Sequence, residues 1–363
     1  MAMVRLATQI LRSFGAGLLL SATLSVSGES FDHPHPQAGF NLIPVIASLP
    51  TPTAYTNPVY RGDMPDPTVV RYDGVYYAFG TTGSDRVQGR IFTMLRSTNL
   101  VNWERLGGAL TPPFPNPDYQ YWAPEVVYAE GKFFMYYAMG RFNPTHFENR
   151  VAISTTPEGP YTDTGSVLID CKANNYCIDP FPFHDDDGQW YFFYSAQLPN
   201  AEPPFHPGTG IVVDRLVNMT RLAGDCHVVV QGRYDWTRAS QDKDWHVLEG
   251  PCVLKHEGKY YCIYSGNGYK SIHYGLDCVV ADHPLGPFTG QGESARVLHD
   301  VAGKVRGPGH NDVVYGPDNE TQYFVYHAWD EDMTKRQMCI DKLIWTPEGP
   351  RCDGPTYAHQ LAP

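Results

Sequence analysis

One hairpin pattern recurs five times along this 363-residue chain, and the recurrence constrains the fold more than any other feature. Each unit opens on a polar residue and a short apolar run. It then turns at a Gly-containing or polar pair and continues as an aromatic strand, which is the signature of a β-hairpin. The units start near residues 66, 124, 179, 249 and 310. In most units a third strand follows, and a Gly-Pro turn then leads into an outer strand.

The spacing of the unit starts, roughly 55 to 70 residues, predicts the architecture. Four-stranded units at this period are typical of propeller blades. We therefore expect an all-β fold, a five-bladed β-propeller in a single domain. A β-sandwich or two stacked β-domains is the alternative, and the repeated unit opening favours the propeller. The 34 Gly and 31 Pro disfavour long helices, and the 24 Tyr and 17 Phe favour strands.

The N-terminal segment predicts export from the cell. Arg5 and Arg12 precede an apolar run over residues 14–26, which small residues follow. This pattern is typical of a secretory signal peptide, here residues 1–28. A short membrane anchor is the alternative, but this run is shorter than the about 20 apolar residues that a membrane span needs. Residues 29–54 are rich in Pro, His and Ser and are expected to be a linker into the propeller, residues 55–363.

The eight cysteines fit an extracellular location, because an even number in a secreted chain suggests disulfide bonds. Cys171 and Cys177 are close enough in sequence for a local loop, and Cys339 with Cys352 would fasten the last unit. Other connectivities stay open. With 27 basic against 39 acidic residues, the formal charge of −12 gives no support to a nucleic-acid or membrane partner.

Three of the five units open on a carboxylate: Asp66, Asp179 and Glu249. In a propeller the innermost strand of each blade lines a central channel, so the unit openings converge at one mouth of it. Two carboxylates are enough to hydrolyse a glycosidic bond, and a third raises the pKa of the acid. Asp before Pro, or Glu before Gly-Pro, can also merely close a turn. Its recurrence in three units favours catalysis, but spacing alone assigns no roles.

Five short motifs in order make the chain resemble glycoside hydrolase family 43 over residues 57–355. They are Asn57-Pro-Val with Gly62-Asp-Met-Pro-Asp66-Pro, Tyr121-Trp-Ala-Pro-Glu125, Ile178-Asp179-Pro, Leu248-Glu249-Gly-Pro and Gly309-His310-Asn. The resemblance implies a secreted five-bladed propeller that degrades arabinan or xylan with inversion at the anomeric carbon. It implies Asp66 as general base, Glu249 as general acid and Asp179 as the residue that raises the pKa of Glu249 and orients it.

Four further residues are candidates for binding. Trp122 and Glu125 open the second unit and would face the sugar, although Trp122 could equally pack between blades. Arg306, before Gly307-Pro-Gly, would bind a sugar hydroxyl or pair with a catalytic acid. His310 matches a histidine that in relatives lies near a channel cation. We expect no cofactor for the chemistry, and a structural Ca²⁺ in the central channel is a candidate; the alternative for His310 is a turn residue bonded to a neighbouring blade.

The expected partner is an arabinose- or xylose-containing glycan, and we expect a monomer. Within the family, an exo-acting α-L-arabinofuranosidase is favoured, with β-D-xylosidase and endo-arabinanase as alternatives. The motifs of sucrose and fructan hydrolases are absent, as are Gly-x-Ser-x-Gly and His-Glu-x-x-His. A non-catalytic glycan-binding propeller is the alternative from a different class, and it would not need three aligned acids.

Overall fold

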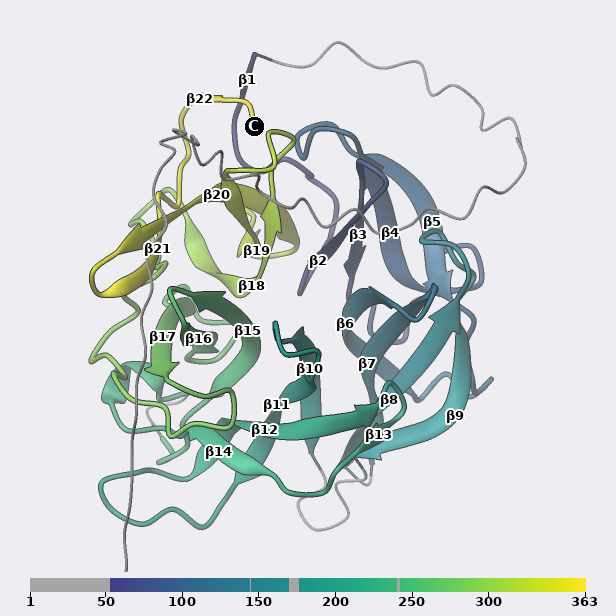
Figure 1. The fold of residues 1–363 in the computed structure, drawn as a ribbon. Coiled ribbons are helices and arrows are strands. Elements are labelled where there is room, and N and C mark those ends of the chain that lie inside the picture. Colours follow the sequence, from purple (N-terminus) through teal and green to yellow (C-terminus); the bar gives the residue numbers. More distant parts are fainter. Residues whose placement is uncertain (1–52, 144, 170–175, 240–241) are drawn as a thin grey trace, which may run out of the picture. The chain divides into compact units, whose positions relative to one another are not determined.

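Five antiparallel sheets surround a central axis in the computed structural model, which describes residues 53–363 except 144, 170–175 and 240–241 (Figure 1). Strand order within each sheet follows chain order, as short hairpin connections require. The prediction of an all-β, five-bladed propeller is confirmed. The predicted signal peptide, residues 1–28, and all but the last two residues of the linker lie outside the described residues and stay predictions.

The blades are named here in chain order. Blade 1 contains β2 (Thr68–Tyr72), β3 (Val75–Gly80), β4 (Ile91–Ser97) and β5 (Glu104–Leu110). Blade 2 contains β6 (Gln120–Ala129), β7 (Lys132–Phe142), β8 (Thr145–Ser154) and β9 (Thr162–Ile169). Blade 3 contains β10 (Cys177–His184), β11 (Trp190–Leu198), β12 (Gly208–Asn218), β13 (Arg221–Leu222) and β14 (His227–Val230). Blade 4 contains β15 (Leu248–His256), β16 (Lys259–Gly266) and β17 (Gly275–Ala281). Blade 5 contains β18 (Arg306–Tyr315), β19 (Gln322–Trp329), β20 (Arg336–Thr346) and β21 (Gly349–Cys352).

Two blades depart from the expected four strands. In blade 3 both β13 and β14 pair with β12. In blade 4 the outer strand is reduced, within the described residues, to two isolated bridges, Val280 with Thr289 and Leu276 with Leu298. The segment that reaches Thr289 contains two prolines and Gly286, which has φ +83°, so it cannot continue a regular ladder.

The apolar core lies between the blades. Separate clusters of buried side chains join blade 1 to blade 2, 2 to 3, 3 to 4, 4 to 5, and 5 back to 1. The aromatic middle strands supply much of this packing; Tyr136 and Phe192, for example, join blades 2 and 3 with ring centroids 5.4 Å apart. Each blade is therefore buried on both faces, which explains why its middle strand reads as a nearly continuous apolar run.

The described ends of the chain meet at blade 5. β1 (Ala54–Tyr55) pairs with β22 (Gln360–Leu361), and the Asn57 amide donates to Ile340 O at 2.9 Å on β20. These contacts fasten the segment before blade 1 to the last blade, so the ring is closed by hydrogen bonds as well as by side-chain packing.

A residue with the same left-handed backbone conformation, called here the bulge position, lies at the start of every innermost strand, and in blades 2 to 5 the ladder shifts register there. Asp66, Ala123, Asp179, Gly250 and His310 all have φ between +43° and +58°. Only a few per cent of non-glycine residues adopt this region, so its repetition marks a feature of the fold. All five residues line a narrow channel at the axis. The bulge turns the chain at the channel mouth and aims the residues around it at one place.

The disulfide prediction is wrong for one pair. Cys339 and Cys352 both carry free thiols, as do the described Cys226, Cys252, Cys262 and Cys278. Cys177 is not among the free cysteines, and its suggested partner Cys171 lies outside the described residues, so that pair stays a prediction. Among the residues that the model describes, no helix has the length and apolar character to cross a membrane.

Candidate active site

The three predicted carboxylates line one cavity of about 390 Å³ at the channel mouth. Asp66 comes from blade 1, Asp179 from blade 3 and Glu249 from blade 4. The other lining residues come from all five blades: Thr81, Gln120, Trp122, Phe142, Tyr176, Ile178, Tyr269, His310 and Arg336. The repeat therefore brings together acids that are separated by nearly two hundred positions in sequence.

Asp66 is held as an ionised carboxylate. Arg336 Nη1 donates to its Oδ1 at 2.7 Å, and Thr81 Oγ1 donates to its Oδ2 at 2.7 Å. Burial alone would raise the pKa of Asp66, but the Arg336 guanidinium beside it holds this pKa well below the usual range. An unprotonated carboxylate in this position can accept a proton from a water molecule.

A buried histidine fixes the backbone of Asp66. The Asp66 N–H donates to His327 Nδ1 at 3.1 Å, so this nitrogen is an acceptor and carries no proton. Burial, reinforced by the charge of Arg336, lowers the pKa of His327 well below its ordinary value. His327 therefore stays neutral and positions Asp66 without adding a charge.

Glu249 has the opposite protonation tendency. Burial is the main cause that raises the pKa of Glu249 to about 7, and the charge of Asp66 adds to it. The Tyr274 hydroxyl donates to Glu249 Oε1 at 2.8 Å and partly opposes the rise. One cavity thus contains a carboxylate that stays ionised and a carboxyl group that keeps its proton near neutral pH, which are the requirements of a base and an acid.

Asp179 is hydrogen-bonded to β15, the strand that carries Glu249. Its Oδ2 accepts from Gly250 N–H at 3.0 Å and from Ser195 Oγ at 3.2 Å. Burial raises the pKa of Asp179 to about 7, His310 opposes the rise, and Glu249 and Asp66 add to it. Asp179 is therefore placed to fix the direction of Glu249 through the adjacent peptide.

Aromatic side chains form one side of the cavity. Trp122, Phe142 and Tyr176 line it. The Trp122 ring stacks on Phe147 with centroids 4.1 Å apart and planes inclined by 20°. Trp122 therefore packs on an aromatic ring of its own blade and lines the cavity, and its contact with a sugar ring stays a prediction. Apolar ring faces are suited to the C–H faces of a sugar.

The comparisons with known proteins give the same family as the motifs. The family model described as glycosyl hydrolases family 43 matches residues 55–350. The chain belongs to this family. A β-D-galactofuranosidase of Aspergillus niger is 28% identical over 333 residues, covering 87% of this chain and 88% of the relative. An extracellular endo-α-(1→5)-L-arabinanase of Bacillus subtilis is 26% identical, with coverages of 77% and 85%.

A solved structure supports the same assignment. A thermostable family-43 glycoside hydrolase superimposes with a TM-score of 0.73 at 31% identity, covering 85% of this chain and 99% of that one. This family-43 protein is accordingly a glycoside hydrolase of plant polysaccharides.

Two predicted residues lie in the channel below the cavity. Glu125 lines the channel but not the cavity with the acids, and burial with the nearby charge of Asp312 raises the pKa of Glu125 well above its ordinary value. His310 lines both spaces, with Nδ1 3.5 Å from Asp66 Oδ1. Its backbone N–H donates to Ser265 Oγ at 2.9 Å, as expected for the turn residue bonded to a neighbouring blade.

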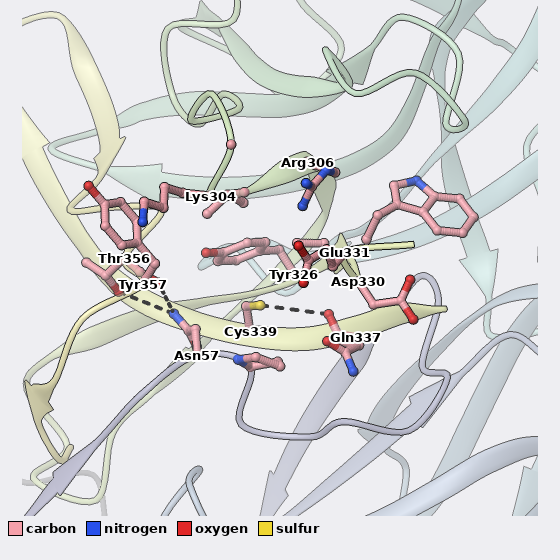
Figure 2. A pocket seen from close by; sticks show the side chains of 15 residues that line it. Asn57, Lys304, Arg306, Tyr326, Asp330, Glu331, Gln337, Cys339, Thr356 and Tyr357 are labelled. Carbon is pink, nitrogen blue, oxygen red and sulfur yellow. Dashed lines mark hydrogen bonds between the residues drawn. The ribbon is translucent and has the colours of Figure 1, made fainter. Parts of the chain in front are cut away.

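Arg306 lies elsewhere. It lines a second cavity, of about 240 Å³, together with Lys304, Asp330 and Tyr357 (Figure 2). Arg336 takes the place beside the catalytic acids that the sequence analysis considered for Arg306. Trp329 lines the second cavity and lies beneath the Arg336 guanidinium, 5.8 Å from it, so the two cavities are neighbours.

The sequence analysis missed five residues that contact the acids: Thr81, Ser195, Tyr274, His327 and Arg336. Only His327 carries a signal that could have been noticed, because it is a histidine inside an otherwise apolar, aromatic strand. Arg336 begins β20, and its sequence neighbours do not distinguish it from the other arginines.

Proposed function

We propose that this family-43 protein is an inverting, exo-acting α-L-arabinofuranosidase that is secreted to release arabinose from plant polysaccharides. The observation that carries the proposal is the opposite protonation of Asp66 and Glu249 in one cavity. The arrangement supports a single displacement by water.

In this reaction Asp66 takes a proton from water as the water oxygen bonds to the anomeric carbon. Glu249 gives its proton to the glycosidic oxygen as that bond breaks. The products are a sugar of inverted configuration and a free hydroxyl on the remaining glycan. Asp66 ends protonated and Glu249 ionised, and one proton exchange with solvent restores both. Asp179 serves as the positioning residue through Gly250 N–H.

The lining of the cavity supports exo action. Its residues come from all five blades, so it has walls on every side, as suits the terminal residue of a chain. An endo-acting enzyme needs a groove through which the glycan continues in both directions. We place Trp122 against the terminal sugar ring. β-D-Xylosidase and endo-arabinanase remain the alternatives within the family.

A second candidate substrate is a β-D-galactofuranoside. The Aspergillus niger relative named for that activity aligns over most of both chains. The ring carbons of β-D-galactofuranose have the same configuration as those of α-L-arabinofuranose, and the two sugars differ in the length of the exocyclic side chain. One cavity could accept both if the space beyond the ring is sufficient.

The test compares kcat/KM on p-nitrophenyl α-L-arabinofuranoside, β-D-galactofuranoside and β-D-xyloside and on linear arabinan. We expect the arabinofuranoside to be the best substrate and arabinan to yield arabinose only. Short oligosaccharides from arabinan would show endo action, and preference for the xyloside would refute the furanosidase assignment. Proton NMR of the first product identifies its anomer, and retention would refute the role of Asp66 as a base for water.

We also propose a structural ion in the channel and a monomeric, extracellular protein. The channel has space for about one water-sized group, 10 Å³, and is lined by Asn311. Within the described residues, neither the oxygen nor the nitrogen of this buried amide has a hydrogen-bond partner. An oxygen donor of this kind fits Ca²⁺, with His310 in an outer position. The ion would stabilise the blade junction and add positive charge below Asp66.

A further inference from the structure

A cluster of His206, Asp244 and His246 lies outside the catalytic cavity. None of the three lines that cavity, and one ligand atom from each lies within 4.8 Å of those of the other two. His206 precedes β12, and Asp244 and His246 precede β15, so the cluster lies where the loops of blades 3 and 4 meet. His246 is fully buried, while the side chains of His206 and Asp244 are 34% and 51% exposed. A ligand can therefore approach from solvent.

The distances in the cluster match a tetrahedral metal site. Asp244 Oδ1 lies 3.0 Å from His206 Nδ1 and 3.4 Å from His246 Nε2. Zinc–ligand bonds of about 2.05 Å at tetrahedral angles place ligand atoms about 3.3 Å apart. The two distances to Asp244 are therefore close to the spacing that one ion requires, and the third pair of ligand atoms lies within 4.8 Å.

The hydrogen bonds of His246 prepare its Nε2 to be a ligand. Thr237 Oγ1 lies 2.9 Å from Tyr234 O, to which it donates, and 2.7 Å from His246 Nδ1, an arrangement that favours His246 Nδ1–H as the donor to this oxygen. The proton of a neutral His246 is therefore on Nδ1, and Nε2 presents a lone pair.

This lone pair has no suitable partner among the described residues. His246 Nε2 is buried and makes no hydrogen bond there, and it faces the carboxylate of Asp244 at 3.4 Å. Two acceptors that face each other repel, and a cation between them would turn the repulsion into attraction. A ligating histidine whose other nitrogen donates to an oxygen is the usual arrangement at metal sites.

The backbone holds the two histidines in place before any metal arrives. His246 N–H donates to Pro207 O at 2.9 Å, and His246 O accepts from Thr209 N–H at 2.9 Å. The rings of His206 and His246 stack with centroids 4.4 Å apart. A side chain at Gly208 would meet His246 O at 1.8 Å, so the glycine permits this close approach.

Other charged groups around the cluster limit its affinity for a cation. Arg238 Nη2 lies 3.4 Å from Asp244 Oδ1 and competes with a cation for that carboxylate. In the metal-free protein the His206 ring also contacts Asp244 through Nδ1 and must present this nitrogen without a proton to bind an ion.

We propose that His206, Asp244 and His246 bind one divalent transition-metal ion of the zinc class, with a water molecule in the fourth position. Two imidazoles and a carboxylate are a typical ligand set for such ions, and the exposed side leaves room for water. The ion would join the segment before β12 to the loop that enters β15. His246 is three residues ahead of Glu249, so the ion fastens the loop that leads to the catalytic acid without taking part in the reaction.

The test is a Co²⁺ titration of the full, untagged chain after removal of metals with a chelator. We expect one equivalent to give the intense visible bands of tetrahedral Co²⁺, and Zn²⁺ to abolish them. His206→Ala and Asp244→Asn should each weaken binding at least about tenfold, as expected for the loss of a ligand. His227→Ala is the matched control, because His227 is an exposed histidine 3.7 Å from Asp225 on the same blade.

The ligand variants change partly exposed side chains, so folding is expected to survive, and circular dichroism checks it. Since His33 and His35 could also take metal, only a signal that His206→Ala removes supports the site. No tetrahedral band in the wild-type protein, or a band unchanged by both ligand variants, would overturn the proposal. Hydrogen exchange gives a second measure: Zn²⁺ should slow exchange at residues 242–247 in the wild type and not in Asp244→Asn.

Discussion

Replacing Arg336 with methionine should move the acid limb of the pH–rate profile toward neutral pH. Arg336 Nη1 donates to Asp66 Oδ1 at 2.7 Å, and both side chains are nearly buried, 14% and 11% exposed. Methionine keeps much of the apolar volume of the arginine stem and removes the charge. Burial would then dominate, because it is already the largest influence on the Asp66 carboxyl and acts to raise its pKa.

The size of the shift follows from the charge that is lost. Two unit charges about 4 Å apart interact by about 4 kcal/mol at an effective dielectric constant of about 20. At 1.36 kcal/mol per pKa unit this corresponds to about 3 units. The cavity admits water, so we expect a rise of about 2 to 3 units in the pKa of Asp66. The alkaline limb, set by Glu249 with a pKa of about 7, should rise less, because Arg336 is a minor influence on that group.

The measurement is kcat/KM across the pH range on the best p-nitrophenyl glycoside. In the wild type the pKa of the base is held well below its usual range, so the profile should show little acid limb. In Arg336→Met a clear acid limb should appear, since Asp66 now takes up a proton as the pH falls. Arg306→Met is the matched control, because Arg306 lines the neighbouring cavity and makes no contact with the acids in the described structure.

Two results would contradict the reasoning. If Arg336→Met lowered kcat/KM by the same factor at every pH, Arg336 would act by binding the sugar and not through the charge of Asp66. If Arg306→Met shifted the acid limb and Arg336→Met did not, the cavity assignment itself would be wrong. Thermal unfolding of both variants separates these outcomes from a loss of folding, since Arg336 also lies over the Tyr269 ring.

Three further predictions concern the buried carboxyl groups. Glu249→Gln should lower kcat on arabino-oligosaccharides by about 10²–10⁴ but far less on p-nitrophenyl glycosides, whose leaving group needs little protonation; equal losses would contradict its role as the acid. Glu125→Gln should raise the Tm at neutral pH, because burial disfavours the ionised carboxylate and the neutral amide needs no proton, and should leave kcat/KM close to that of the wild type; a large loss of kcat/KM would place Glu125 in the sugar site after all. As the pH rises from about 5 to 7, the Tm should fall. Asp179 and Glu249 have native pKa values of about 7, so over this window they bind more protons in the folded than in the unfolded state; a Tm that rises with pH would refute these shifts.

The sequence predicted the fold and the carboxylates because both are encoded by a repeat. A hairpin pattern that recurs at blade spacing is compatible with few topologies, and a propeller brings the unit openings to one channel. The partners of the acids carry no such signal. Arg336 reaches Asp66 from β20 across 270 positions of sequence, and Tyr274 reaches Glu249 from the loop before β17. The exact strand register of blade 5 decides which arginine binds Asp66, and no local pattern of residues predicts that register.

The same repeat explains why similar acids have different tasks. The left-handed bulge residue is Asp66 in blade 1 and Asp179 in blade 3, but in blade 4 it is Gly250. Glu249 is therefore one position earlier in its unit, where blade 2 has Trp122. At the bulge position Asp66, Asp179 and His310 line both the channel and the cavity, whereas Glu249 and Trp122 line the cavity only.

This difference of one residue has a chemical consequence. The two bulge acids lie at the axis beside His310, and Asp66 is neutralised there by Arg336. Glu249 instead lines the cavity only, where its longer side chain accepts a hydrogen bond from the Tyr274 hydroxyl. Arg336 has only a minor influence on it, so Glu249 keeps its proton near neutral pH. Moving a carboxylate by one position along the innermost strand thus separates an acid from a base without any change in the fold.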